Sequence, residues 1–404
     1  MRSAVVISVV AILVIASLGV GYLAGNVTQH TQTLTSTSVL ISKQTITTTL
    51  TSQQTITSTI TSTMFTGQPI PVTEIETANT TIGGLPSAFV INPNDSRIYI
   101  TNLFSNNLTV VYTPGWSASP LISNITLPSR PNGIAIDYST GTVYIAVTGG
   151  IEEVNGSTDQ IVRELRLGLS GSLAYNPSTH ILYGLSGNEY LSGSEGLQSL
   201  TAVDVRTGAV VANISLGYQA YGVALDPKKG MVFAVGCDTQ GIVCNSMVSV
   251  VNGTDEALVA TVRLGSEYGP SMAVDPETDV VYVSGEDQLV ALNGTNGDII
   301  FKANPLVCAL DGMTVIPSSD QLVAVSGTGK GNYVLVYDGA SGALVNMYSF
   351  PSGLQSVAFD SGTGEFYATQ SGEFLSQLVS FPNAASTGSV DSALIGNGQG
   401  CLPP

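Results

Sequence analysis

Few side chains in this 404-residue chain have the chemistry for acid, base or metal work. The sequence holds 2 histidines, His30 and His180, and 1 tryptophan, Trp116. It contains no Gly-x-Ser-x-Gly motif, paired carboxylates, Cys/His pair or Gly-rich phosphate loop. Catalysis therefore has little support, and we predict no catalytic residue, no cofactor and no bound metal.

Carboxylates nevertheless recur at one position, directly after short apolar runs. These are Asp137, Asp226, Asp275 and Asp360. An Asp between two strands typically caps the turn through its carboxylate, so we interpret this set as turn caps. A second set lies in predicted loops that could face one mouth of a central channel, where a Ca²⁺ site is the open alternative: Glu189, Glu195, Asp238, Glu267, Glu286, Asp287 and Asp311.

Four cysteines fit an oxidising compartment. Cys237 and Cys244 bracket a short loop that a local disulfide can span. That pairing leaves Cys308 and Cys401, whose bridge would pin the C-terminal tail. Four cysteines allow three connectivities, of which we predict this one. A zinc site is disfavoured, because the first two cysteines are seven apart and neither histidine lies near them.

Seven similar repeats must position these residues. Each begins with a short apolar run, and we take the last residue of that run as its marker. Markers of successive repeats lie 39 to 50 residues apart, a period typical of propeller blades. The markers are Asn92, Asp137, Asn176, Asp226, Asp275, Ile316 and Asp360. Second strands follow after turns rich in Asp, Asn, Pro and Gly, such as 98–102, 143–146 and 281–284. The pattern predicts an all-β, seven-bladed propeller over residues 69–384.

The ring also needs closing. Blade seven has only three strands before Pro382, whereas residues 71–84 form an orphan fourth strand. We predict that this N-terminal strand completes blade seven and leaves no free sheet edge. The alternative is a fourth strand from Ser389–Ile395.

The repeats carry a family resemblance. The strand motif Tyr99-Ile-Thr-Asn102, the turn Asp204-x-x-Thr-Gly208, the ending Leu216-Gly217 and the Asp-Pro turns resemble the Tyr-Val-Thr-Asn (YVTN) family of β-propeller repeat proteins. The resemblance covers about residues 71–384, although only blade one carries the tetrapeptide nearly intact. It implies a propeller of the archaeal and bacterial cell-surface type, while its function stays open, because propellers host enzymes and binding modules alike.

The N-terminal segment indicates where the propeller works. Residues 4–24 are uncharged, follow Arg2 and are long enough to cross a bilayer. We predict a membrane anchor over residues 1–25 with its N-terminus inside; a cleaved signal peptide is the alternative. The remaining chain would then lie outside as a single-pass cell-surface protein.

Residues 26–68 have the composition of a stalk. Of the 41 residues from 26 to 66, 16 are Thr and 6 are Ser. β-Branched residues favour an extended chain, and the segment has too little apolar surface to fold alone. Fully extended at about 3.3 Å per residue, it would span on the order of 100 Å. Its regular Ile and Leu spacing leaves self-association of stalks open. Residues 385–404 form a Gly/Ser/Asn-rich tail.

Nine Asn-x-Ser/Thr sequons agree with an exterior location. They predict glycosylation at Asn26, Asn79, Asn94, Asn107, Asn124, Asn155, Asn213, Asn252 and Asn293. Asn-Gly-Thr and Asn-Gly-Ser are also good turn sequences, which is the structural explanation for some of them.

Charge limits the partners. With 12 Lys+Arg against 29 Asp+Glu and a pI near 4.2, the chain should repel nucleic acid. Only 10% of its residues are charged, so we expect a surface of hydroxyls and amides suited to protein or glycan contact.

We therefore expect a glycosylated, non-enzymatic surface protein that binds or adheres. A membrane-tethered enzyme of the lactonase or sugar-processing kind with a channel metal is the alternative, and an extracellular filament subunit is a third. The stalk should join the propeller on the face with the first-to-second turns. The opposite face holds the longest loops and should meet the partner, with Tyr190, Tyr218, Tyr221 and Tyr268 as aromatic contacts and the turns at Asp226 and Asp275 silent. Packing of these tyrosines between blades is the alternative.

Overall fold

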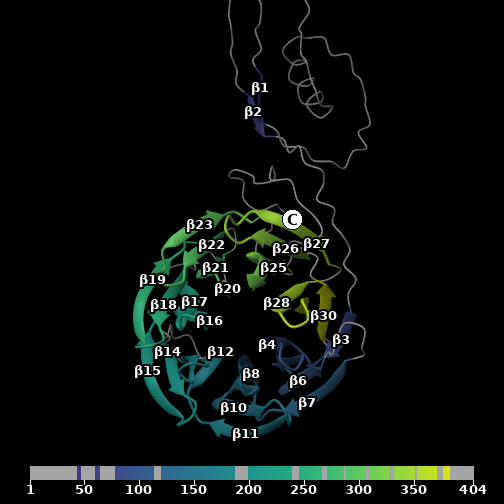
Figure 1. Ribbon diagram of the computed structural model, residues 1–404, viewed down its shortest axis with the longest axis vertical. Helices are drawn as coiled ribbons and strands as arrows, with labels where there is room; N and C mark the ends of the chain where they lie inside the picture. Colours follow the sequence, from purple (N-terminus) through teal and green to yellow (C-terminus); the bar gives the residue numbers. More distant parts are fainter. Residues whose placement is uncertain are drawn as a thin grey trace, which may run out of the picture.

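A seven-bladed propeller forms the body of the computed structural model (Figure 1). The structure describes residues 43–46, 60–63, 78–112, 120–186, 199–238, 245–265, 271–285, 288–305, 310–326, 332–350, 353–370 and 376–382. Each blade is a four-stranded antiparallel sheet whose first strand lies innermost. The predicted all-β propeller is confirmed.

The blades follow chain order. Blades one to three are β4 (Pro86–Asn92), β5 (Arg97–Asn102), β6 (Asn107–Tyr112) and β7 (Leu121–Thr126); β8 (Pro131–Asp137), β9 (Thr142–Val147), β10 (Gly150–Asn155) and β11 (Gln160–Leu165); and β12 (Leu169–Asn176), β13 (Ile181–Ser186), β14 (Ser199–Asp204) and β15 (Ala209–Ser215). Blades four and five are β16 (Gln219–Asp226), β17 (Met231–Asp238), β18 (Asn245–Asn252) and β19 (Ala257–Arg263), and β20 (Met272–Asp275), β21 (Val280–Ser284), β22 (Leu289–Asn293) and β23 (Ile299–Ala303).

Blade six comprises β24 (Gly312–Ile316), β25 (Gln321–Ser326), β26 (Tyr333–Asp338) and β27 (Leu344–Ser349), with a 3₁₀ turn at Pro317–Ser319. Blade seven comprises β28 (Leu354–Asp360), β29 (Glu365–Gln370), β30 (Ser376–Pro382) and β3 (Ala78–Ile82). Strand β3 pairs antiparallel with β30, from Ala78 opposite Ser380 to Ile82 opposite Ser376. The predicted N-terminal closure is confirmed, and β3 occupies the place that the alternative gave to Ser389–Ile395.

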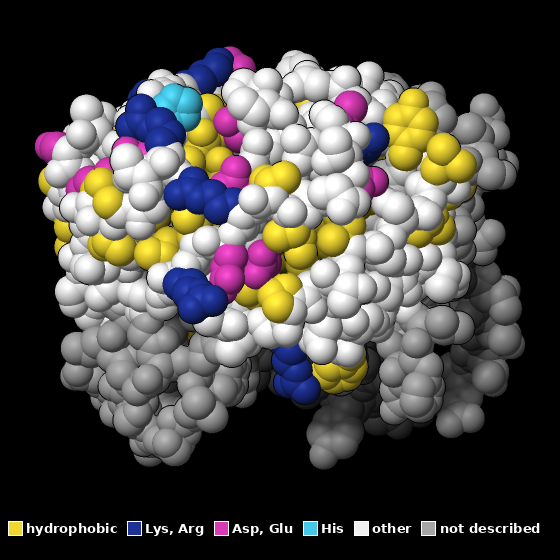
Figure 2. Space-filling view, turned by 90° about the horizontal axis from the view of Figure 1, so that it is seen from below, with side chains coloured by type: hydrophobic (Ala, Val, Ile, Leu, Met, Phe, Trp, Pro, Cys, Tyr) yellow, Lys and Arg dark blue, Asp and Glu magenta, His cyan; other side chains and the backbone are white. Residues whose placement is uncertain are grey.

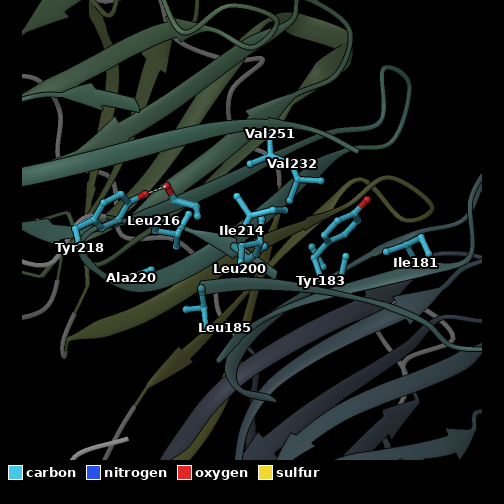
Figure 3. Packing of buried hydrophobic residues seen from close by; sticks show 14 residues of the cluster. Ile181, Tyr183, Leu185, Leu200, Ile214, Leu216, Tyr218, Ala220, Val232 and Val251 are labelled. Carbon is cyan, nitrogen blue, oxygen red and sulfur yellow. Dashed lines mark hydrogen bonds between the residues drawn. The ribbon is translucent and has the colours of Figure 1, made fainter. Parts of the chain in front are cut away.

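The core of the described residues lies between the blades. It divides into seven apolar clusters, one at each interface of neighbouring blades. Figure 3 shows the cluster between blades three and four, where Tyr183, Leu200 and Val232 pack together. Each blade therefore buries both of its faces against its neighbours.

The polar repeat residues shape the turns. Asn92, Asn176 and the four recurrent aspartates each accept a hydrogen bond through Oδ1 from the backbone N–H two residues later, at 2.8 to 3.2 Å. The turn-cap interpretation of Asp137, Asp226, Asp275 and Asp360 is confirmed. In blade six, where Ile316 offers no such oxygen, the 3₁₀ turn takes the place of the cap.

The motif from Tyr99 to Asn102 is structural. Tyr99 Oη donates to the Gly156 carbonyl of blade two at 3.3 Å. Thr101 Oγ1 donates to the Ala88 carbonyl at 3.0 Å, and Asn102 Nδ2 reaches Asn107 Oδ1 and Thr109 Oγ1, each at 2.9 Å. These bonds join strands and blades, which explains why such a motif specifies the fold and not the function.

Outside the propeller, β1 (Lys43–Ile46) and β2 (Ile60–Thr63) form an antiparallel pair. The extended stalk expected from composition stays a prediction, because most of residues 26–68 lie outside the described residues. No helix among the described residues is both long and apolar enough to cross a membrane. The predicted anchor, residues 4–24, and the tail, residues 385–404, lie outside the described residues.

Candidate functional site

The two faces of the ring differ in what they carry. The turn face holds the turns between first and second and between third and fourth strands. The loop face holds the second-to-third loops and the connections between blades. Strand β3 runs from Ala78 on the turn face to Ile82 on the loop face, and β30 ends at Pro382 on the turn face. Both ends of the described ring therefore lie on the turn face, which leaves the loop face free of them.

Bulges mark the loop-face end of the innermost strands. The register shifts between Pro86 and Ala88, and similar shifts occur in blades two, three, four and seven. The residues left over at these shifts include Ser87, Ser172 and Tyr221. Bulges are often found next to functional sites, so these positions form the described part of the candidate site.

The mouth is built tightly from small residues. Ser87 Oγ donates to the Pro131 carbonyl at 3.1 Å, and Ser284 Oγ donates to the Leu310 carbonyl at 3.2 Å. A Cβ on Gly133 would lie 1.8 Å from the Gly171 carbonyl oxygen, so only glycine allows this approach. Both hydroxyls bond the next blade and therefore link neighbouring blades at the mouth.

The predicted tyrosine contacts separate into different environments. Tyr221, the extra residue of the β16 bulge, is 43% exposed and donates to Gln219 Oε1 at 3.3 Å. Tyr218 is 2% exposed, and its hydroxyl donates to the Ala234 carbonyl at 2.7 Å (Figure 3). The predicted contact role is wrong for Tyr218, because it packs between blades three and four. Tyr190 and Tyr268 lie outside the described residues.

The loop carboxylates give no metal cluster among the described residues. Asp238 pairs with the Arg263 guanidinium, Nη1 to Oδ2 at 3.8 Å, and Asp311 lies in the connection leading to β24. The other five carboxylates considered as Ca²⁺ ligands, Glu189, Glu195, Glu267, Glu286 and Asp287, lie outside the described residues.

One histidine relay does exist, on the turn face. Tyr175 Oη lies 3.0 Å from His180 Nδ1 and 3.2 Å from Asp137 Oδ2. Burial raises the pKa of Tyr175 to about 12, helped by Asp137. Burial alone would raise the pKa of Asp137, but hydrogen bonds from Ser139, Thr140 and Tyr175 lower it overall. These contacts link blades two and three, and a phenol with a raised pKa keeps its proton at neutral pH.

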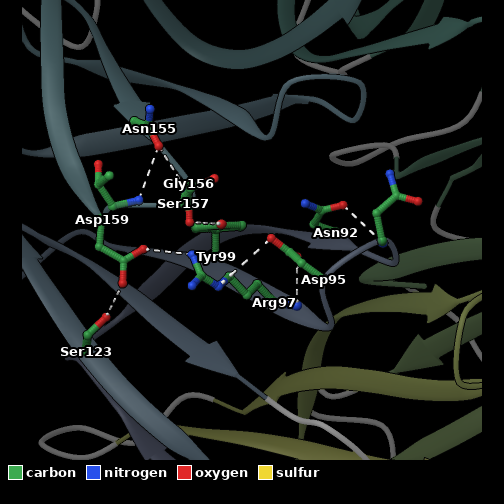
Figure 4. A network of polar contacts seen from close by, with 11 residues as sticks. Asn92, Asp95, Arg97, Tyr99, Ser123, Asn155, Gly156, Ser157 and Asp159 are labelled. Atoms are coloured by element: carbon green, nitrogen blue, oxygen red, sulfur yellow. Dashed lines mark hydrogen bonds and ion pairs between the residues drawn. The ribbon is translucent and has the colours of Figure 1, made fainter.

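A second polar network ties blade one to blade two on the same face (Figure 4). The Arg97 guanidinium contacts Asp159 Oδ1 at 3.3 Å, and Ser123 Oγ donates to Asp159 Oδ2 at 3.1 Å. Asp159 adopts a left-handed backbone with φ of 54°. The charged side chains of Arg97 and Asp159 thus form a contact between two blades on the turn face.

Cys237 is buried and disulfide-bonded. Its predicted partner Cys244, and the predicted pair Cys308 and Cys401, lie outside the described residues. The connectivity therefore stays a prediction.

Apolar side chains form a row around the rim. Figure 2 shows hydrophobic patches at mid-height, interrupted by charged side chains. The outermost strands of blades one to five each expose two consecutive apolar residues: Leu121 and Ile122, Ile161 and Val162, Val210 and Val211, Leu258 and Val259, and Ile299 and Ile300. In blades two to five a bulge between third and fourth strands accompanies the pair, which protects the sheet edge from strand pairing.

Comparisons with known proteins show similarity in fold alone. No protein-family model matches the chain, and no curated protein matches it in sequence. Among solved structures, a chain of the hydrazine synthase of Kuenenia stuttgartiensis is similar, with a TM-score of 0.59 and 12% identity over 72% of this chain and 94% of that chain. In all, 1489 solved chains match. A shared fold does not by itself identify a function.

Proposed function

We propose that the chain is a membrane-anchored, extracellular binding propeller whose loop face meets a protein or glycan partner. The observation that carries the proposal is the direction of β3. Residues preceding Ala78 reach the ring on the turn face, so an N-terminal anchor holds the loop face away from the membrane.

The distribution of side-chain roles supports the same orientation. On the turn face, the recurrent aspartates cap turns, and Arg97, Asp159, Tyr175 and His180 bond one blade to the next. On the loop face, the bulge in β16 turns an aromatic residue, Tyr221, toward solvent. Aromatic residues presented on a rigid scaffold are typical of binding surfaces.

The test displays the full chain on cells and measures their attachment to glycan arrays and to immobilised extracellular proteins. Tyr221→Ala should weaken attachment, as should replacement of residues 187–198 and 239–244 by Gly-Ser linkers. The matched control is Tyr138→Ala, which removes a tyrosine that is 51% exposed, against 43% for Tyr221, from the turn face. Equal losses for the two tyrosine variants, with both proteins folded, would contradict the orientation.

Labelling of lysines on intact cells tests separately whether the propeller lies outside the cell. Lys228 and Lys229 lie on the turn face, in the turn after Asp226, and should react without lysis. Lysines that react only after lysis would place the propeller inside. Lactone hydrolysis with added Ca²⁺ by the same preparation would favour the enzymatic alternative, and filaments in negative-stain micrographs would favour the third.

A further inference from the structure

Three of the seven outermost strands carry a sequon asparagine at the same register position. Asn124 lies opposite Thr109, which lies opposite Ile100, the residue after Tyr99. Asn213 occupies the same place in blade three, opposite Thr201 and Gly184 after Tyr183. Asn79 of β3 occupies it in blade seven, opposite Val379 and Ala368. The other blades have Glu164, Thr261, Lys302 and Met347 there.

A buried hydroxyl orients each of the two asparagines whose side chains are described. Thr109 Oγ1 donates to Asn124 Oδ1 at 2.7 Å, and Thr201 Oγ1 donates to Asn213 Oδ1 at 2.6 Å. Both threonines are buried, and both asparagines are exposed. With the carbonyl oxygen held from inside, the amide nitrogen Nδ2 turns outward and donates to no group in the described part of the chain.

The hydroxyl residue of each rim sequon is also accessible. Thr126 and Ser215 are exposed at the ends of β7 and β15. Each sequon therefore presents its amide nitrogen and its hydroxyl together, on the solvent side of an outermost strand.

In the sequons of Asn94 and Asn107, by contrast, the amide nitrogen Nδ2 donates a hydrogen bond. Asn94 Nδ2 donates to the Tyr138 carbonyl at 2.9 Å. Asn107 Nδ2 donates to Asn124 Oδ1 at 3.3 Å, and the hydroxyl of its sequon, on Thr109, is fully buried. Modifying either asparagine in the folded ring would break native hydrogen bonds.

We propose that Asn124 and Asn213 are acceptors of N-linked glycans on the folded ring, with Asn79 as the third position of this kind by register. In the transfer, the amide nitrogen attacks C1 of the sugar of a polyprenyl-phosphate-linked oligosaccharide. The N–C1 bond forms, the C1–O bond breaks with its electron pair leaving on the phosphate, and the amide releases one proton. Glycosylation in the cell rests on the proposed function, because the chain must be exported to meet the transferase. The structural pattern of the acceptor asparagines does not depend on the proposed function.

The rim glycans have a defined neighbourhood. Asn124 follows the exposed pair Leu121 and Ile122 on β7, and Asn213 follows Val210 and Val211 on β15. Sugars at these two positions cover the apolar rim of blades one and three and leave the pairs of blades two, four and five bare.

The experiment uses the purified, folded full chain made without glycans. It is incubated with a single-subunit oligosaccharyltransferase that requires only Asn-x-Ser/Thr and with a lipid-linked oligosaccharide, and occupancy is read by glycopeptide mass spectrometry. Asn124 and Asn213 should be modified at least about tenfold more than Asn94 and Asn107, which corresponds to about 1.4 kcal/mol for opening the hydrogen bonds of the latter pair. Thr126→Ala and Ser215→Ala should each remove one glycan only.

The unfolded, reduced chain is the control for enzyme competence, and it should be modified at Asn94 and Asn107 as well. Equal occupancy at all four asparagines of the folded chain, or unmodified Asn124 and Asn213 beside a modified unfolded control, would overturn the proposal. Because the reaction is carried out with purified components, its result is independent of the labelling experiment on intact cells, which alone decides the location.

Discussion

Phe233 in blade four offers a place where one added hydroxyl should stabilise the ring. The equivalent residue of blade five, Tyr282, donates to the Gly339 carbonyl of blade six at 3.0 Å. Burial and then the nearby Asp320 carboxylate raise the pKa of this hydroxyl. In blade four the ring carbon Cζ of Phe233 points at Gly294 of blade five in the same way. Asp279, the counterpart of Asp320, has its Oδ1 buried there without a hydrogen-bond partner.

The substitution Phe233→Tyr should supply that missing donor. A hydrogen bond to a charged acceptor contributes about 1.5–3 kcal/mol, and desolvating the hydroxyl reduces this to an expected net gain of about 1–2 kcal/mol. For a ring of about 300 residues, an unfolding entropy of about 2.1 cal/mol/K per residue converts this gain into a Tm increase of about 2–3 °C.

Scanning calorimetry and urea titration of the full chain measure the effect, with Tyr282→Phe as the mirror variant. The mirror variant should lose a similar amount, with an unchanged dependence on urea concentration because the exposed surface is the same. A lower Tm for Phe233→Tyr together with an unaffected Tyr282→Phe would refute the role assigned to this hydroxyl.

Three further predictions concern charge, closure and crosslinks. Glu152 is 4% exposed, and burial and then the facing Glu164 raise the pKa of its carboxyl. The stabilisation that Glu152 contributes is therefore full below the pKa of about 4.3 that it has in the unfolded chain, and it is lost as pH rises through its pKa in the folded protein. Glu152→Gln should therefore gain stability relative to the parent between pH 4 and pH 7 in urea titrations; a difference independent of pH would contradict this. Ile82→Ala should cost about 2–5 kcal/mol, since Ile82 packs with Tyr367 and Leu378 at the closure, whereas Thr81→Ala on the exposed side of β3 should change stability by less than about 0.5 kcal/mol. Non-reduced peptide mapping should link Cys237 to Cys244 and Cys308 to Cys401, the longer loop adding roughly 4–5 kcal/mol in the chain-entropy model; a Cys237–Cys308 link, or zinc at a stoichiometric level, would contradict the pairing.

The ring and its closure were predictable because they depend on patterns that repeat. Alternating apolar residues fixed the strands, and the Asp or Asn after each first strand fixed the turns. The orphan segment before Leu85 could be assigned to blade seven because an open ring leaves a sheet edge unpaired.

The environment of single side chains was harder to predict. Leu216, Tyr218 and Ala220 alternate inward, which could have identified Tyr218 as a core residue. The bulge between Ala220 and Gly222 then shifts the alternation by one, so that Tyr221 faces solvent and Val223 is buried. A bulge depends on how two strands meet, and a single strand's sequence carries no signal for it. The apolar pairs of the rim were missed for the same reason.

Ring closure by β3 also determines how the molecule bears tension. In an anchored chain that has met its partner, the load enters at Ala78 and leaves through the loop face, so it runs along the strand. The pairs from Ala78–Ser380 to Ile82–Ser376 are then sheared together instead of being opened one after another. Their lifetime under force follows the unfolding rate of the blade and not its equilibrium stability. If the chain is anchored and bound as proposed, the joint that completes the circle is also the mechanical coupling between the membrane and the partner.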